Sequence, residues 1–226
     1  MSRAWFVTGT DTGVGKTFAS VALLHALRAR GLRAVGMKPV ASGCDRTPAG
    51  WRNEDALALQ AASDPPPAYR DVNPFALPAA TAPQLAAREA DIAVALPPLV
   101  AAFGRLAETA DAVVVEGAGG WLAPMGDGLE QSAMARAAGG EVLLVVGLRL
   151  GCLSHARLTA RAIEADGCRL AGWIGNRVDP EFERVDDYLR LLGAALPAPC
   201  LGVLGHGAAP AAAADALRLP GDDAGA

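Results

Sequence analysis

Short, continuously apolar runs alternate along this chain with longer stretches in which apolar residues recur at helical spacing. Such a run is typical of a strand buried on both faces of a parallel sheet, and the intervening pattern predicts amphipathic helices. The expected strands cover residues 4–8, 33–38, 111–116, 141–147, 170–175 and 201–204. The expected helices cover residues 16–30, 54–62, 96–109, 153–165 and 181–192. We therefore predict an α/β fold, a single-domain, doubly wound, mostly parallel sheet with helices on both faces.

The whole chain, residues 1–226, is expected to form one domain, because its length suits a single hydrophobic core. Residues 65–83 are rich in Pro and Ala and predict a long surface excursion rather than a linker between domains. From about residue 208 to residue 226 the chain is rich in Ala, Asp and Gly. This tail predicts a short helix followed by a frayed end.

Composition and charge narrow the possible functions mainly by exclusion. Apolar residues make up 52% of the chain and charged residues 19%, which excludes a disordered tail. The formal net charge of −4 argues against a general nucleic-acid binder. Charges, Pro and Gly interrupt every long apolar stretch, and the first strand follows the initial Met too closely for a signal peptide. With four widely spaced cysteines and no Cys-x-x-Cys pair, these features predict a cytoplasmic protein with reduced thiols.

The usage of basic residues singles out two positions. Of the 20 Lys and Arg residues only Lys16 and Lys38 are lysines. An exposed cation tolerates exchange between Lys and Arg, but a site that needs a compact ammonium on a flexible stem does not. Both lysines are therefore candidate site residues before any motif is considered.

A glycine-rich segment joins the first expected strand to the first expected helix. It reads Gly9-Thr10-Asp11-Thr12-Gly13-Val14-Gly15-Lys16-Thr17. Five residues separate Gly9 from Gly15, where the common P-loop pattern has four. In a P-loop the backbone N–H groups hold phosphates, the lysine reaches the β and γ oxygens, and the following hydroxyl binds Mg²⁺. The segment thus predicts a fold of the P-loop NTPase type that binds a nucleotide, against the alternative of a turn that merely opens a helix.

Further polar residues follow the other strands, whose carboxyl ends meet at one edge of a doubly wound sheet. Glu116 ends a strand and is a candidate Mg²⁺ partner. Asp55 lies in the first turn of a helix, where its charge either serves Mg²⁺ or only complements the helix dipole. Lys38 and Ser42 could hold an anionic intermediate of phosphoryl transfer.

These motifs together resemble the dethiobiotin synthetase family. The resemblance rests on the P-loop segment, on Lys-Pro-Val-Ala-Ser-Gly at 38–43, on Arg-Asn-Glu-Asp-Ala-Leu at 52–57 and on Val-Glu-Gly-Ala-Gly-Gly at 115–120. It continues through Leu-Gly-Cys-Leu-Ser-His at 150–155, Ala-Gly-Trp-Ile-Gly-Asn at 171–176 and Tyr188. The motifs stand in family order and spacing and span the chain to about residue 204.

The resemblance implies an ATP-dependent cyclo-ligase of biotin biosynthesis, acting as a homodimer. Its substrates would be 7,8-diaminononanoate, CO₂ (or bicarbonate) and MgATP, and its products dethiobiotin, ADP and phosphate. One amine would take up CO₂ as a carbamate, which MgATP phosphorylates, and the second amine would close the cyclic urea. No nucleic acid or membrane partner is implied.

The resemblance also implies roles for individual residues. Catalytic roles fall to Thr12, Lys16, Lys38 and Ser42, and the Mg²⁺ ligands to Thr17, Asp55 and Glu116. The nucleotide would contact Gly13, Val14, Gly15, Lys16, Thr17, Phe18, Asp55, Glu116, Gly117, Ala118, Gly119, Asn176, Arg177, Gly205, His206 and Gly207. The substrate would contact Lys38 and Ser42 and, across the dimer interface, Gly151, Cys152, Leu153, Ser154 and Tyr188.

The sequence departs from the family pattern in three places, and other classes of protein share its P-loop. Ser154 stands where Asn is common, Gly205-His206-Gly207 lacks a frequent proline, and Gln84 replaces a frequent histidine. One alternative is a partition or septum-positioning ATPase switch, whose P-loop carries a signature lysine where this chain has Asp11. A second is an ATP-dependent amidase of corrin biosynthesis, which normally adds a glutaminase domain. A third is a paralogue without activity, against which the intact Lys16, Thr17, Lys38 and Glu116 argue.

Overall fold

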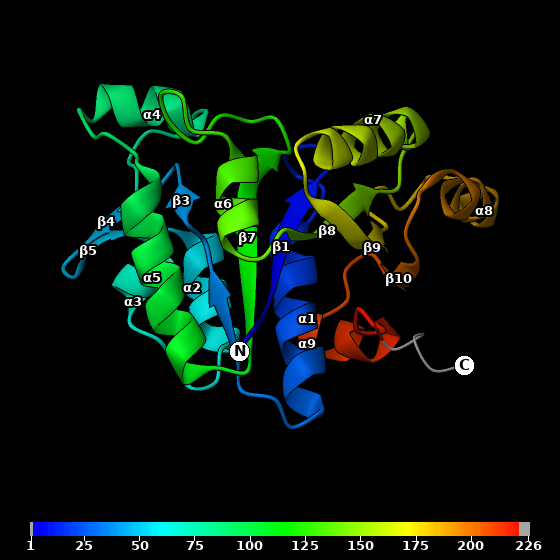
Figure 1. The fold of residues 1–226 in the computed structure, drawn as a ribbon. Helices are drawn as coiled ribbons and strands as arrows, with labels where there is room; N and C mark the ends of the chain where they lie inside the picture. The colour runs from blue at the N-terminus through cyan, green and yellow to red at the C-terminus, as the bar shows by residue number, and fades with distance from the viewer. Residues whose placement is uncertain (1, 222–226) are drawn as a thin grey trace.

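The computed structural model describes residues 2–221, and its centre is a six-stranded sheet (Figure 1). The strand order is β10-β9-β8-β1-β7-β2, and every neighbouring pair is parallel. These strands are β1 (Arg3–Gly9), β2 (Ala34–Met37), β7 (Ala112–Gly120), β8 (Glu141–Gly147), β9 (Arg169–Asn176) and β10 (Cys200–Leu204). The predicted parallel α/β fold is confirmed.

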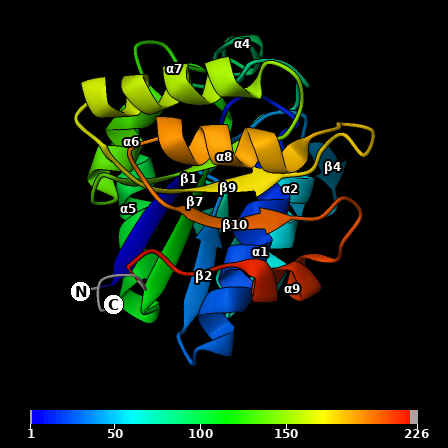
Figure 2. The same ribbon diagram turned by 90° about the vertical axis from the view of Figure 1, so that its right-hand side faces the viewer.

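Helices cover both faces of this sheet, as Figures 1 and 2 show. They include α1 (Lys16–Ala29), α2 (Glu54–Ala62), α5 (Leu96–Thr109), α6 (Gln131–Ala137), α7 (Cys152–Ala165) and α8 (Val185–Ala195). Side chains of β1 alternate between two apolar clusters: Phe6 faces the cluster under α5, α6, α7 and α8, whereas Trp5 and Val7 face the cluster under α1 and α2. This alternation buries the sheet on both sides, which explains why its strands are continuously apolar.

Most expected elements have bounds within one residue of the observed ones, and two differ by more. The strand expected to end at residue 116 continues as β7 to Gly120, because after a shift in register Gly120 pairs with Gly9 of β1. The helix expected at 181–192 lies at Val185–Ala195, because Asp179 accepts a hydrogen bond from the Glu181 N–H and holds that segment in a turn. The helices expected at 54–62 and 96–109 have the expected bounds.

The segment between β2 and α5 contains small elements that the sequence did not predict. They are β3 (Val40–Ala41), β4 (Asp45–Thr47), β5 (Gly50–Arg52), α3 (Tyr69–Val72), β6 (Phe75–Ala76) and α4 (Pro83–Glu89). Residues 65–83, expected as a surface excursion, include the fully buried Val72 and Leu77, and β6 pairs with β3. This correction places several polar side chains of the segment beside the end of β2.

The described part of the C-terminal tail forms α9 (Pro210–Ala213) and the 3-10 turn η1 (Ala214–Ala216). Ala213 and Ala214 are buried in the apolar cluster under α1, which confirms the short helix. The expected frayed end at 222–226 lies outside the described residues. Within residues 2–221, no helix has the length and apolar character needed to cross a membrane.

Candidate active site

The P-loop segment adopts a backbone that favours glycine at two positions. Gly13 and Gly15 have φ angles of 74° and 83°, in the left-handed region. A Cβ atom at Gly15 would lie 2.0 Å from Nδ2 of Asn176, so this position is closed to larger residues. Gly15 is the N-cap of α1, so the loop delivers its N–H groups to the positive end of that helix. This geometry suits an anion such as a phosphate group.

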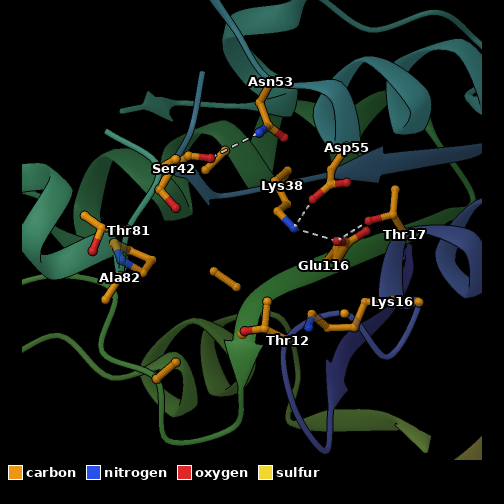
Figure 3. A pocket seen from close by; sticks show the side chains of 18 residues that line it. Thr12, Lys16, Thr17, Lys38, Ser42, Asn53, Asp55, Thr81, Ala82 and Glu116 are labelled. Atoms are coloured by element: carbon orange, nitrogen blue, oxygen red, sulfur yellow. Dashed lines mark hydrogen bonds and ion pairs between the residues drawn. The ribbon is translucent and has the colours of Figure 1, made fainter. Parts of the chain in front are cut away.

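Four side chains from four elements meet beside this loop (Figure 3). The Nζ of Lys38, just after β2, lies 2.5 Å from Oε1 of Glu116 and 2.9 Å from Oδ2 of Asp55. The hydroxyl of Thr17 donates to the same Oε1 of Glu116 at 2.9 Å. Because β2 and β7 are adjacent and parallel, Lys38 and Glu116 leave the sheet at the same edge. The structure thus brings together the predicted Lys38, Asp55, Glu116 and Thr17.

The ionic states in this cluster follow from its burial and charge. Burial alone would lower the pKa of Lys38, but the carboxylates of Glu116 and Asp55 outweigh it and raise the pKa above its usual value. Burial would raise the pKa of Asp55, yet the ammonium of Lys38 holds it below the ordinary range. Burial and the nearby charge of Lys38 lower the pKa of Lys16 to about 8. The site therefore holds an ion-paired Lys38 beside a Lys16 that is costly to keep charged.

The oxygen atoms around Glu116 fit a divalent metal ion. Oε2 of Glu116 is buried and has no hydrogen-bond partner among the described residues, although a buried carboxylate oxygen is normally paired. Together with the hydroxyl of Thr17 and the carboxylate of Asp55, it offers the hard oxygen ligands that Mg²⁺ prefers. Mg²⁺ usually binds one or two protein carboxylates and completes its shell with water and phosphate oxygens. The residues present thus fit the predicted Mg²⁺ role.

The cluster opens into a cavity of about 680 Å³. Thr12, Gly13, Gly15, Lys16 and Thr17 line it from the P-loop and the start of α1, and Ser42 and Thr81 line it from the opposite side, as Figure 3 shows. The remaining predicted residues on its wall are Lys38, Asp55, Glu116, Ala118 and Gly119. The cavity can hold a polyphosphate next to a second, smaller reactant.

A second cavity of about 300 Å³ adjoins the P-loop, and Gly13 lines both cavities. Its other walls include the predicted residues Phe18, Asn176, Arg177, Gly205, His206 and Gly207. Asn176 donates from Nδ2 to the carbonyl oxygen of Val14 at 2.9 Å, which ties the end of β9 to the P-loop. Because it shares Gly13 of the phosphate loop with the first cavity, this cavity suits a nucleoside.

The structure does not bring the other predicted substrate residues to either cavity. The side chain of Cys152 is buried in the core, Ser154 is exposed, and the ring of Tyr188 packs edge-on against Phe182 at 4.7 Å. Gly151 and Leu153 lie at the start of α7, also outside both cavities. Their predicted roles depend on a second copy of the chain and stay predictions. Similarly, the side chain of Val14 is buried beneath the loop, so only its backbone can serve a phosphate.

The sequence did not predict several residues of the cavity wall, such as Asn53 and Thr81, nor the buried Gln131 behind that wall. Gln131, the first residue of α6, is fully buried. Its Nε2 donates to the carbonyl oxygens of Ala118 at 2.9 Å and Gly120 at 2.5 Å, and its Oε1 accepts the N–H of Ala118 at 3.1 Å. Gln131 thus fixes the backbone that forms one wall of the cavity. No motif marks it, because its role depends on the path of the Gly-rich end of β7.

We expect Gln131→Glu to reduce the free energy of unfolding by about 2–3 kcal/mol, because a carboxylate would face the carbonyl oxygens that now accept from the amide. The matched control is Gln60→Glu, since Gln60 lines neither cavity and, among the described residues, donates only to the carbonyl oxygen of Pro67. Urea unfolding of the two variants measures the difference. Equal stability losses would show that Gln131 has no special part in holding this backbone.

The parallel sheet, the loop at the N-terminus of α1 and the carboxylate at the end of the neighbouring strand define a P-loop nucleotide-binding protein. Two solved structures share the fold. The cell division protein FtsY of Thermotoga maritima has a TM-score of 0.55 and 17% identity, with 96% of this chain and 68% of that chain covered. The septum site-determining protein MinD of Pyrococcus horikoshii, complexed with Mg-ADP, has a TM-score of 0.54 and 17% identity, with 91% and 82% covered.

The sequence comparisons identify the family within this class. A family model described as an AAA domain matches residues 3–207. The ATP-dependent dethiobiotin synthetase BioD of Xanthomonas euvesicatoria is 58% identical over 219 residues, which cover 96% of this chain and 98% of the relative. BioD of Xylella fastidiosa is 59% identical over 222 residues, which cover 97% and 98%. The chain belongs to the dethiobiotin synthetase family.

Proposed function

We propose that this protein is an ATP-dependent dethiobiotin synthetase. It would convert 7,8-diaminononanoate, CO₂ and ATP into dethiobiotin, ADP and phosphate. The observation that carries the proposal is the cluster of Lys38, Glu116, Asp55 and Thr17 beside a P-loop lysine, in a chain 58% identical to relatives of that name over 96% of its length.

The proposed reaction has three steps. One amine of the substrate adds to CO₂ and loses a proton, which gives a carbamate. A carbamate oxygen attacks the γ-phosphorus of ATP and ADP leaves, which gives a carbamic–phosphoric anhydride. The second amine then attacks the carbamate carbon, the C–O bond to phosphate breaks, and the cyclic urea is released with phosphate. The first step forms an anion, the second brings the anionic carbamate and ATP together, and the third releases phosphate, so catalysis depends on positioning and on positive charge.

The P-loop would bind the polyphosphate of ATP. The backbone N–H groups at the N-terminus of α1 would bind phosphate oxygens, and Lys16 would supply a positive charge beside the β and γ positions. Thr17, Asp55 and Glu116 would hold Mg²⁺, which when bound would neutralise charge on the β- and γ-phosphates. The second cavity, lined by Asn176 and the 205–207 segment, would hold the nucleobase.

Lys38, Ser42 and Thr12 would act on the carbamate and the transferred phosphoryl group. The Nζ of Lys38 is buried and lies between the proposed metal ligands and the open part of the cavity, so it can reach an anion placed there. Ser42 and Thr12 line the cavity and offer hydroxyl groups to the substrate. A compact ammonium fits this position better than a planar guanidinium, which accounts for a lysine in an Arg-rich chain.

The carboxylate of the substrate would bind at a homodimer interface formed by Gly151, Cys152, Leu153, Ser154 and Tyr188. These residues lie at the start of α7 and on α8, outside the cavities of one chain. Leu150 and Leu158, before and on α7, are 81% and 61% exposed, and contact with a second copy would remove their apolar area from water. The oligomeric state follows from sedimentation or light scattering.

The test of the proposed function is phosphate release from MgATP and bicarbonate, with and without 7,8-diaminononanoate. We expect release only with the diamine, together with a product of the mass of dethiobiotin. Hydrolysis that ignores the diamine would overturn the proposal in favour of a switch ATPase. Absence of hydrolysis with ATP, CTP and GTP would identify a protein without this activity. Comparing the rates of phosphate release with these three nucleotides also shows which base the 205–207 segment accepts.

A further inference from the structure

A series of hydrogen bonds that becomes more buried along its length begins at the hydroxyl of the half-buried Tyr69, on α3 (Tyr69–Val72). This hydroxyl accepts the backbone N–H of Asn53 at 2.8 Å and donates to Oδ1 of Asn73 at 3.1 Å. Asn73 is 3% exposed and donates from Nδ2 to the carbonyl oxygen of Lys38 at 2.7 Å. The N–H of Lys38 in turn donates to the carbonyl oxygen of Val72 at 2.7 Å. Both sides of the Lys38 backbone are therefore held by the segment that carries Asn73.

The other end of this series of hydrogen bonds leads to Asp55. Asn53 is the N-cap of α2, where its side chain accepts the N–H of Ala56, and Asp55 lies in the first turn of that helix. Asp55 in turn accepts from Nζ of Lys38. The contacts close a ring that runs from the ammonium of Lys38 through Asp55, Asn53, Tyr69 and Asn73 back to the carbonyl oxygen of Lys38.

The ring matters because one of its contacts is expected to change when ligands bind. The carboxylate oxygens that bond Nζ of Lys38 belong to Asp55 and Glu116, the same residues that would hold Mg²⁺, and a longer hydrogen bond of 3.4 Å goes to the carbonyl oxygen of Gly117. Once these carboxylates face a metal ion, the ion pair no longer fixes Lys38 relative to α2. Besides the hydrogen bond from Nδ2 of Asn53 to the carbonyl oxygen of Ser42 at 3.3 Å, the hydrogen bonds through the Tyr69 hydroxyl then still link the two segments.

We propose that Tyr69 and Asn73 are positioning residues that hold the backbone of Lys38 and the N-terminus of α2 at a fixed separation when the Mg-nucleotide is bound. This inference rests on the proposed function for its kinetic part. Its structural part, the geometry of the metal and phosphate ligands, does not depend on which reaction follows. The guanidinium of Arg52 lies 4.1 Å from the centre of the Tyr69 ring and keeps the ring oriented independently of the hydroxyl.

The test is Tyr69→Phe in the full chain, which removes one oxygen and keeps the ring and its contact with Arg52. We expect kcat for diamine-dependent phosphate release to fall about 5- to 20-fold, the size of one well-placed hydrogen bond, with KM for the diamine within about two-fold. Calorimetric titration should show Mg-ADP binding about 5-fold more weakly, while ADP with EDTA binds as tightly as to the unaltered protein. The metal-dependent difference is the readout that loss of stability alone would not produce.

The matched control is Ser63→Ala. Ser63 also has a buried hydroxyl with two hydrogen bonds, to the carbonyl oxygen of Leu59 and the N–H of Gly36, but it lies at the opposite end of α2. We expect it to lower Tm about as much as Tyr69→Phe and to leave kcat and Mg-ADP affinity unchanged. If the two variants behave alike in all three measurements, Tyr69 is only structural and the proposal is overturned.

Two further comparisons keep the inference separate from the proposed function. Asn73→Ala combined with Tyr69→Phe should weaken Mg-ADP binding by less than the product of the single effects, because both substitutions interrupt the same closed set of hydrogen bonds. If the two substitutions weaken Mg-ADP binding by the full product of their single effects, Tyr69 and Asn73 do not act through the same set of hydrogen bonds and the proposal is overturned. If the unaltered protein lacks diamine-dependent phosphate release, the proposed function fails, whereas the Mg-ADP titrations still decide the role of Tyr69.

Discussion

Replacing Lys16 by methionine is expected to stabilise the ligand-free protein and to abolish its response to nucleotide. Burial and the charge of Lys38 lower the pKa of Lys16 from 10.5 to about 8, so the folded protein keeps this ammonium charged at a cost of about 3 kcal/mol at pH 7. Methionine removes that cost but loses the hydrogen bond from Nζ to the carbonyl oxygen of Asp11, worth about 1 kcal/mol. The net gain of about 2 kcal/mol corresponds to a rise in Tm of about 4–8 °C.

The pH dependence of this gain has a definite sign. Between pH 8 and 10.5 the unfolded chain binds more protons at Lys16 than the folded protein does, so the stability of the unaltered protein rises with pH in that window. The advantage of Lys16→Met should therefore shrink from pH 7 to pH 10. Urea unfolding at both pH values measures it, and Mg-ADP should raise the Tm of the unaltered protein but not of the variant.

The control for this prediction is Arg161→Met, which removes an exposed cation of α7. It should leave both the free energy of unfolding and the Tm shift with Mg-ADP nearly unchanged. A Lys16→Met variant less stable than the unaltered protein would show that the ammonium stabilises the empty site. That outcome would contradict the physical account of its lowered pKa.

Replacing Lys38 by methionine should have the opposite effect on stability. Glu116 is fully buried, and its Oε1 would lose the ammonium that now lies 2.5 Å away. Removing one partner of a buried ion pair costs about 3–5 kcal/mol. The deficit should shrink as pH falls, because the lowered pKa of Asp55 gives the unaltered protein a stabilising contribution that exists only while Lys38 is present and is lost in acid.

Two companion variants separate charge from chemistry. Lys38→Met combined with Glu116→Gln removes both charges, so it should recover most of the stability and none of the turnover. Lys38→Arg keeps the charge and should fold normally, yet its turnover should fall about 100-fold or more, because a planar guanidinium cannot replace a point ammonium at this position. Near-normal phosphate release by Lys38→Arg would show that the site does not require lysine.

The sequence predicted the central sheet well because its strands are buried on both faces. The fully buried Val113, Val114 and Val115 form an apolar run that surface strands would not show. The Gly-rich loop before Lys16 could be predicted equally well, since its positive φ angles favour glycine at fixed positions. Periodicity and backbone chemistry are local properties, and local properties can be read from one chain.

The structure of the segment between β2 and α5 could not be predicted in this way. Its strands β3 and β6 are two residues long and pair only with each other, so neither has a pattern of its own. Tyr69 and Asn73 owe their importance to Lys38, more than 30 residues earlier. Gln131 likewise acts on a turn that has no regular spacing from it. Contacts of this kind depend on the assembled fold, so the pattern of one sequence does not indicate which residues make them.

The position of β1 in the sheet has a consequence for the order in which the protein can mature. The P-loop follows β1, but the neighbours of β1 are β7 and β8, which lie more than a hundred residues downstream. Pairings between such distant segments form late, because the loop between them must first be closed. During synthesis the nucleotide loop therefore stays unsupported until β8 has left the ribosome. The ATP pocket does not exist before that point, so ATP binding cannot assist the earlier steps of folding.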